Sequence, residues 1–131
     1  MEINVRFAGN KRVSAEFDGF TVMTDQPASN GGDGSAPGPF DLFLASLATC
    51  AGYYMLAFMQ KRDIATEGAG VRLRTERDPQ THMVTKIVIE LQLPPGFPEK
   101  YRDVVVRAVD QCTVKRHIID PPVFAVTTQT E

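Results

Sequence analysis

The sequence predicts an α+β fold in which antiparallel sheets pack around one long apolar helix, in the order βββ-α-ββ-α-β. Three observations indicate it: short runs of alternating apolar and polar residues near the N-terminus, an uncharged stretch over residues 42–60, and further alternating runs after it. A period of two is typical of half-buried strands, whereas a helix that is apolar on every side is typical of a core. By length, residues 1–131 are expected to form a single domain.

Three strands are expected before the long helix. In the first of three alternating runs, Ile3, Val5 and Phe7 fall on one face. Turn signals at residues 8–11 and 18–19 separate the runs, so the strands should form a meander. The predicted strands are residues 2–7, 13–17 and 20–24.

A loop and the start of the long helix follow the meander. Residues 26–38 are rich in Gly, Ser, Pro and Ala and lack the spacing of a phosphate-binding motif, so we expect a linker or a flap over a site. Pro39 fits the first turn of a helix, where its missing N–H costs nothing. Asp41 suits the positive end of the helix dipole, and the helix should run to about Arg62.

The second half of the chain is expected to add two strands, a helix and a last strand. Residues 70–76 and 85–93 should form a hairpin, and Pro98 opens the helix. Residues 123–128 are the last predicted strand. The apolar positions of the helix repeat with a period of about 3.6 residues, which points Cys112 into the interior. These positions are Tyr101, Val104, Val105, Ala108 and Cys112.

Composition argues against several classes of partner. The net charge is −2 and no basic run is present, so neither nucleic acid nor an anionic membrane is an expected partner. Residues 42–60 are long enough to span a bilayer, but Tyr53 and Tyr54 lie mid-stretch, whereas tyrosine prefers the membrane interface. A core helix, or one covered by a second subunit, is therefore expected. The N-terminus has no apolar core of signal-peptide length, which favours a cytoplasmic protein.

The two cysteines are the candidate reaction centre. Cys50 lies in the uncharged stretch and Cys112 on the apolar stripe, and both could be inert packing. In a reducing compartment, however, a cysteine pair that meets is more often catalytic or redox-sensing than structural. His82 and His117 could complete a set of four ligands, but the spacings match no zinc finger or ribbon. Neither a metal nor another cofactor is therefore expected.

A reactive Cys50 needs a positive charge from another part of the chain. Burial disfavours the thiolate, and Cys50 lies too far from the start of its own helix to use the helix dipole. The candidates are basic residues of the N-terminal meander, Arg6, Lys11 and Arg12.

Two segments resemble the signatures of one family. Residues 38–50, with the sequence GPFDLFLASLATC, resemble the central-helix signature of the OsmC/Ohr family, in which a proline, an acidic residue and a Leu-Ala-rich segment precede a cysteine. Residues 108–114, AVDQCTV, followed by a terminal strand, resemble its second cysteine site. The resemblance implies a thiol-dependent peroxidase that forms an intertwined homodimer, acts on organic hydroperoxides and is reduced by an external thiol or dithiol.

The resemblance also implies roles for individual residues. Cys50 resembles the cysteine that attacks the peroxide and Cys112 the one that resolves it, with Arg12 as the candidate cation. Members of the hydroperoxide-resistance branch carry a glutamate where this chain has Phe40, and Asp41 lies one position later, a rotation of about 100° around a helix. We expect Asp41 as the acidic site residue. The expected apolar wall of the substrate pocket is Phe40, Phe43, Leu47 and Tyr54.

Two other readings stay open. A protein of the same fold could bind a small hydrophobic ligand in an apolar cleft or sense redox state, with thiols that do not turn over peroxide. Both cysteines could also be plain core residues. The separating feature is a cation within about 4–6 Å of Cys50, which a peroxidase needs and a ligand pocket does not.

Overall fold

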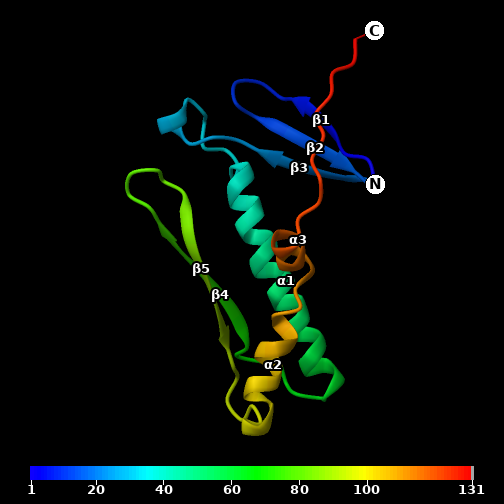
Figure 1. The fold of residues 1–131 in the computed structure, drawn as a ribbon, viewed down its shortest axis with the longest axis vertical. Helices are drawn as coiled ribbons and strands as arrows, with labels where there is room; N and C mark the ends of the chain where they lie inside the picture. The colour runs from blue at the N-terminus through cyan, green and yellow to red at the C-terminus, as the bar shows by residue number, and fades with distance from the viewer. Residues whose placement is uncertain (131) are drawn as a thin grey trace. The chain divides into compact units, whose positions relative to one another are not determined.

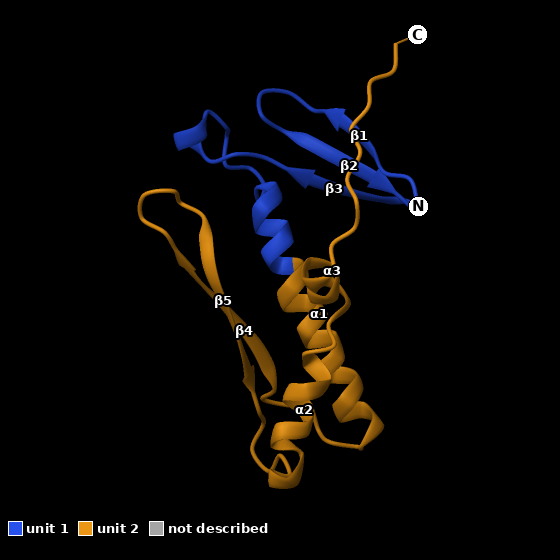
Figure 2. Cartoon of the chain, in the orientation of Figure 1, with its two compact units in different colours: residues 1–45 blue, residues 46–131 orange. Residues whose placement is uncertain are grey.

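The computed structural model describes residues 1–130 and confirms an α+β fold with antiparallel sheets. The elements belong to two compact units, residues 1–45 and 46–131, which Figure 2 colours separately. Figure 1 shows the course of the chain and the element labels. The long helix α1 (Pro39–Lys61) contributes residues to both units.

The N-terminal unit contains the predicted three-stranded meander. Val5 lies opposite Ala15, and Ala15 lies opposite Val22, so apolar side chains share one face of the sheet. The predicted tight turn is formed by Asp18 and Gly19, which both have positive φ angles, 49° and 81°. The antiparallel strands, in the order in which they pair, are β1 (Asn4–Phe7), β2 (Val13–Phe17) and β3 (Phe20–Thr24).

A buried carboxylate holds the loop after β3. Asp25 is fully buried and accepts hydrogen bonds from Ser35 Oγ (2.6 Å), Ser35 N (2.9 Å) and Gln26 N (2.7 Å). These bonds, that from the Ser35 side chain above all, lower the pKa of Asp25 to about 2. At Gly32 a Cβ atom would lie 1.9 Å from Gln26 O, so only glycine fits. The loop, which includes the 3-10 helix η1 (Ala28–Asn30), therefore has a defined structure of its own.

Helix α1 begins at Pro39, as predicted, and ends at Lys61. Asp41 Oδ2 accepts a hydrogen bond from Gly38 N (2.9 Å), which satisfies a backbone donor at the helix start. Tyr53, on a different side of α1 from the buried residues, is 65% exposed. A single chain therefore does not cover every side of this apolar helix. α1 is the one described helix long and apolar enough to cross a membrane, but its buried face belongs to the protein core. The buried residues lie one turn apart on that face: Leu47, Ala51, Met55, Phe58 and Met59.

The C-terminal unit packs α1 against a hairpin and two short helices. Strands β4 (Gly70–Arg77) and β5 (Val84–Gln92) form the predicted antiparallel hairpin. Val105 and Val109 pack against the buried face of α1, and the ring of Phe58 meets that of Tyr101 edge-on at 5.8 Å. The helical segments are η2 (Glu99–Tyr101), α2 (Arg102–Val109) and α3 (Thr113–Ile119).

The predicted helix through Cys112 is interrupted. α2 ends at Val109, and Cys112 lies just before α3 with an extended backbone (φ −46°, ψ 127°). The helix tightens before it stops, because Gln111 N and Cys112 N donate to the carbonyl groups three residues earlier. Cys112 is nevertheless buried, as predicted, with 1% of its surface exposed.

The last predicted strand, residues 123–128, is not formed in the described part of the chain. A strand requires a hydrogen-bonded neighbour, and no described strand pairs with this segment. Its apolar side chains Val123, Phe124 and Val126 are 97%, 85% and 96% exposed.

Candidate functional site

The two cysteines meet in the C-terminal unit. Cys50 is half-buried in the middle of α1, and Cys112 is buried immediately before α3. Both are free thiols, and the Cys112 thiol donates a hydrogen bond to the Cys50 sulfur. Two residues far apart in the sequence therefore form one thiol pair.

The first turn of α3 faces Cys50. Burial opposes ionisation of Cys50, but the bond from Cys112, the backbone N–H groups of Val114 and Thr113 and the positive charge of Arg116 outweigh it. Together they lower the pKa of Cys50 below its ordinary value. The pKa of Cys112 shifts in the opposite direction. Burial and the hydrogen bond that Cys112 donates to Cys50 raise it. Cys50 is thus the thiol of the pair that ionises more readily.

A polar network joins α3 to α1 beside the thiols. The Tyr54 hydroxyl lies 2.9 Å from Thr113 Oγ1, and Arg116 Nη2 donates to the same oxygen at 3.4 Å. Tyr54 is one helical turn after Cys50, and Thr113 directly follows Cys112. Tyr54, which the sequence places in an apolar substrate wall, therefore contributes a polar contact to α3.

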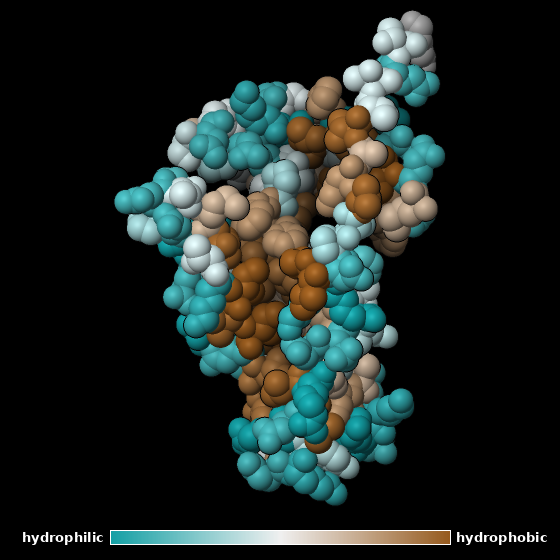
Figure 3. Space-filling view, in the orientation of Figure 1, coloured by the Kyte–Doolittle hydropathy of each residue, from teal (hydrophilic) through white to brown (hydrophobic). Residues whose placement is uncertain are grey.

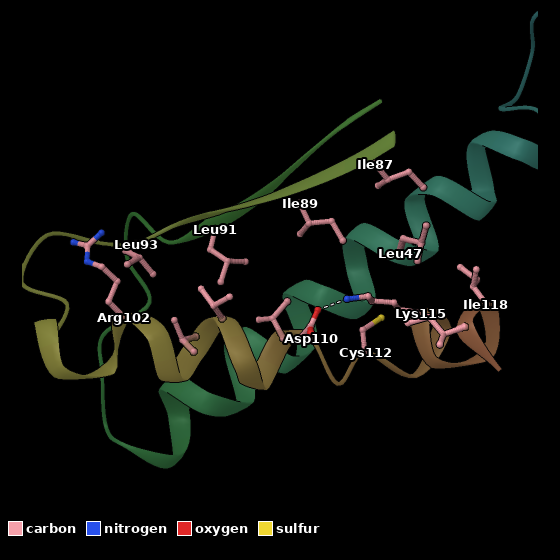
Figure 4. Close-up of a pocket in the computed structure, with 14 residues that line it drawn as sticks. Leu47, Ile87, Ile89, Leu91, Leu93, Arg102, Asp110, Cys112, Lys115 and Ile118 are labelled. Atoms are coloured by element: carbon pink, nitrogen blue, oxygen red, sulfur yellow. Dashed lines mark hydrogen bonds and ion pairs between the residues drawn. The ribbon is translucent and has the colours of Figure 1, made fainter. Parts of the chain in front are cut away.

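An apolar cavity of about 570 Å³ lies between β5, α2 and α3. Figure 4 shows Ile87, Ile89 and Leu91 of β5 on one side of this cavity, with Cys112 and Lys115 on the other. Lys115 forms an ion pair with Asp110 at the edge of the cavity. Figure 3 shows hydrophobic side chains gathered in the middle of the C-terminal unit, on the face that is turned to the viewer. The cavity suits an apolar ligand next to the Cys112 thiol.

The predicted site residues fall in both units. In the C-terminal unit, Leu47 lines the cavity beside the thiol pair. In the N-terminal unit, the rings of Phe40 and Phe43 lie 5.4 Å apart. Arg12 Nη1 forms a 2.7 Å ion pair with Asp33, and Asp41 binds the start of α1.

Arg116 is the functional candidate that the sequence analysis missed. Its positive charge helps to lower the pKa of Cys50, after the hydrogen bonds from Cys112 and from the backbone of Val114 and Thr113. It follows Cys112 by four residues, a spacing of one helical turn, and this spacing was the available signal. Within residues 1–130, no cluster of three or more His, Cys, Asp or Glu side chains could hold a metal ion.

Comparison with known proteins identifies the fold and the family. The family model for OsmC-like proteins matches residues 32–127. A solved structure of a candidate osmotic stress induced and detoxification response protein from Psychrobacter arcticus 273-4 has a TM-score of 0.74 and 22% identity, with 87% of this chain and 85% of that chain covered.

Two further structures share this fold. An OsmC-like protein from Mycoplasma pneumoniae has a TM-score of 0.70 and 13% identity, over 92% of this chain and 87% of that chain. An organic hydroperoxide resistance protein OsmC from Legionella pneumophila has a TM-score of 0.58 and 19% identity, over 90% and 89%. No curated protein matches the sequence.

Proposed function

Because the chain belongs to the family of OsmC-like proteins, we propose that it is a thiol-dependent peroxidase that reduces organic hydroperoxides through Cys50 and Cys112. The observation that carries the proposal is the asymmetry of the thiol pair. Cys112 donates a hydrogen bond to Cys50, and the pKa of Cys50 is lowered whereas that of Cys112 is raised. The likeness to a solved protein named for organic hydroperoxide resistance supports a peroxide-related redox role.

The reaction begins with the Cys50 thiolate. It attacks one oxygen of the hydroperoxide, the O–O bond breaks, and the other oxygen leaves as an alcohol after taking a proton. Cys50 is left as a sulfenic acid. The Cys112 sulfur then attacks the Cys50 sulfur and expels water, which gives a Cys50–Cys112 disulfide. An external thiol or dithiol supplies the two electrons that restore both thiols, as expected of an enzyme working in the reducing cytoplasm.

The apolar cavity supports the choice of an organic substrate. An alkyl or aryl group gains free energy when it leaves water for a cavity lined by Leu47, Ile89 and similar side chains, whereas hydrogen peroxide has no such group. Cumene hydroperoxide should therefore oxidise the protein faster than hydrogen peroxide does. Similar rate constants for the two peroxides would contradict the assignment of the cavity to the substrate.

Exposed apolar surface supports assembly into a homodimer. On the sheet of the N-terminal unit, Val5, Phe7 and Phe20 are 57%, 88% and 65% exposed, which is unusual for a monomer. The unpaired segment at residues 123–128 adds further apolar surface that lacks a strand neighbour. Sedimentation should give twice the 14.4 kDa mass of one chain. A monomer at all accessible concentrations would refute this assembly.

One experiment tests the peroxidase directly. Reduced protein is treated with one equivalent of cumene hydroperoxide, free thiols are counted, and peptides are analysed by mass spectrometry. We expect rapid loss of two thiols and a Cys50–Cys112 crosslink. Cys50→Ser should abolish the reaction, and unchanged turnover in that variant would overturn the proposal.

Substitution also tests Arg12 and Asp41, which we retain as proposed site residues. If they act on the thiol pair, Arg12→Gln and Asp41→Asn should slow oxidation of Cys50 without changing its product. Normal oxidation rates in both variants would remove them from the site.

The same cavity favours a second candidate function, binding of a small hydrophobic ligand without turnover. Thiols that survive excess peroxide, together with saturable binding of an apolar fluorescent probe, would select this function. In that case Leu47→Arg, which places a charge in the cavity wall, should abolish probe binding.

A further inference from the structure

We propose that the hydrogen bond between Tyr54 and Thr113, with Arg116 bound to the same oxygen from within α3, is a polar clamp that holds Cys112 against Cys50, so that these are positioning residues for disulfide formation. This inference rests on the proposed function, because it concerns the second step of that reaction. The clamp consists of two hydrogen bonds that share Thr113 Oγ1, one with Tyr54 at 2.9 Å and one from Arg116 at 3.4 Å.

Thr113 contacts α1 at two points one helical turn apart. Its backbone N–H faces the sulfur of Cys50, and its side-chain oxygen binds the hydroxyl of Tyr54. A single contact would leave the segment free to turn about it, whereas two contacts fix both position and direction. Since Thr113 directly follows Cys112, whatever fixes Thr113 also fixes the resolving thiol.

α3 has few buried contacts of its own. None of its seven residues is buried, and Ile119 is 72% exposed, so apolar packing contributes little to its attachment. Elements with few buried contacts open more readily than the core. The preceding residue, Cys112, has an extended backbone. Among the described residues, the hydrogen bond from its N–H to the carbonyl of Val109 is the backbone bond that ties it to α2. The hydroxyl contact to Tyr54 is therefore a main attachment of this segment to α1.

Disulfide formation is sensitive to such an attachment. The Cys112 sulfur must approach the Cys50 sulfenic acid in line with the departing oxygen, and water leaves as the S–S bond forms. Cys112 helps to ionise Cys50, but once Cys50 is a thiolate its attack on the hydroperoxide does not require the Cys112 sulfur to lie in line with it. Loosening the clamp should slow the second step and spare the first.

The test compares two variants with two matched controls. Thr113→Val removes the shared oxygen at nearly constant shape, and Tyr54→Phe removes its partner hydroxyl. Thr113→Ser keeps the oxygen, and Tyr53→Phe removes a hydroxyl from the adjacent position of α1, where the side chain is 65% exposed. Each protein is mixed with cumene hydroperoxide at a pH that ionises Cys50 in all of them, with and without dimedone, which traps sulfenic acid.

We expect disulfide formation to slow by about 10-fold or more in Thr113→Val and Tyr54→Phe, the loss typical of a misplaced reacting group. The yield of dimedone adduct per oxidised Cys50 should rise in these two variants only. Thr113→Ser and Tyr53→Phe should behave as wild type. Wild-type disulfide rates in Thr113→Val and Tyr54→Phe, or equal slowing in Tyr53→Phe, would overturn the clamp.

Diamide separates failure of the clamp from failure of the proposed function. This reagent takes two electrons and two protons from a thiol pair and needs no peroxidase activity. If hydroperoxide leaves the wild-type protein reduced, the peroxidase proposal fails, but slower closure by diamide in Thr113→Val and Tyr54→Phe still supports the clamp. Equal diamide rates in wild type and both variants would refute it.

Discussion

Replacing Val105 by alanine should lower the free energy of unfolding by about 2–3 kcal/mol. Val105 has no exposed surface, and it belongs both to the core against α1 and to the wall of the cavity. Loss of two methyl groups removes about 1.6 kcal/mol of transfer free energy, at about 0.8 kcal/mol per carbon. The space left behind adds to this loss, because a core relaxes only partly.

The next residue provides a matched control. Val106 lies in the same helix and also lines the cavity, but it is 54% exposed. Valine to alanine improves helix propensity equally at both positions, so the difference between the variants reports packing alone. We expect Val106→Ala to change stability by less than about 0.5 kcal/mol, as is usual for surface substitutions.

Urea unfolding of the reduced proteins measures both changes. Protein concentration is kept constant, since assembly would add a concentration-dependent term. An unchanged m-value with a lower midpoint for Val105→Ala assigns the loss to the folded core. Equal losses for Val105→Ala and Val106→Ala would refute the packing argument, because the two residues would then be equally covered in solution.

Three further predictions concern charge and protonation. Arg116→Gln should raise the pKa of Cys50, so that alkylation of Cys50 shifts to higher pH. The control variant Arg107→Gln on α2 should leave the alkylation profile unchanged. The same pH profile of alkylation in Arg116→Gln and wild type would exclude Arg116 as the cation. Cys112→Ala removes a hydrogen-bond donor and should likewise raise the pKa of Cys50. Each chain of this variant should undergo one oxidation and then stop, which a persistent dimedone adduct would show. Continued turnover would contradict the resolving role of Cys112. Asp25 has a pKa of about 2 in the folded protein against an ordinary 3.8, so its contribution to stability is present above pH 3.8 and is lost as the pH falls through about 2. Asp25→Asn should remove that part of the acid dependence in a circular dichroism titration, and an unchanged titration would show that the carboxylate is not needed.

Local patterns predicted the elements well. The alternation through Val5 and Phe7, the Asp18-Gly19 turn and the proline at position 39 each depend on a few neighbouring residues, and the structure agrees with all three. The burial of Cys112 also followed from a local period. Such features are accessible from sequence because backbone geometry dictates them over one or two turns.

Some features that depend on contacts between distant segments were not predicted. Arg116, whose positive charge acts on Cys50 within the C-terminal unit, was not among the candidate cations, because it belongs to a helix far from Cys50 in the sequence. Tyr54 was assigned to an apolar wall because its hydroxyl partner, Thr113, lies on another helix. A single sequence gives the residue types of such contacts but not their distances.

The predicted helix through Cys112 is interrupted before α3, and this break makes backbone N–H groups available to the Cys50 sulfur. In an unbroken helix, the N–H groups of Thr113 and Val114 would donate to the carbonyl groups four residues earlier and would be unable to serve Cys50. Because a new helix starts at Thr113, these first-turn donors have no partner within it and can face the sulfur. The apolar stripe from Tyr101 to Cys112 is compatible with a continuous or a broken helix, since a short irregular turn can keep a residue on the same side. The break therefore cannot be read from the stripe, yet it is the feature that allows α3 to stabilise a thiolate in the middle of α1.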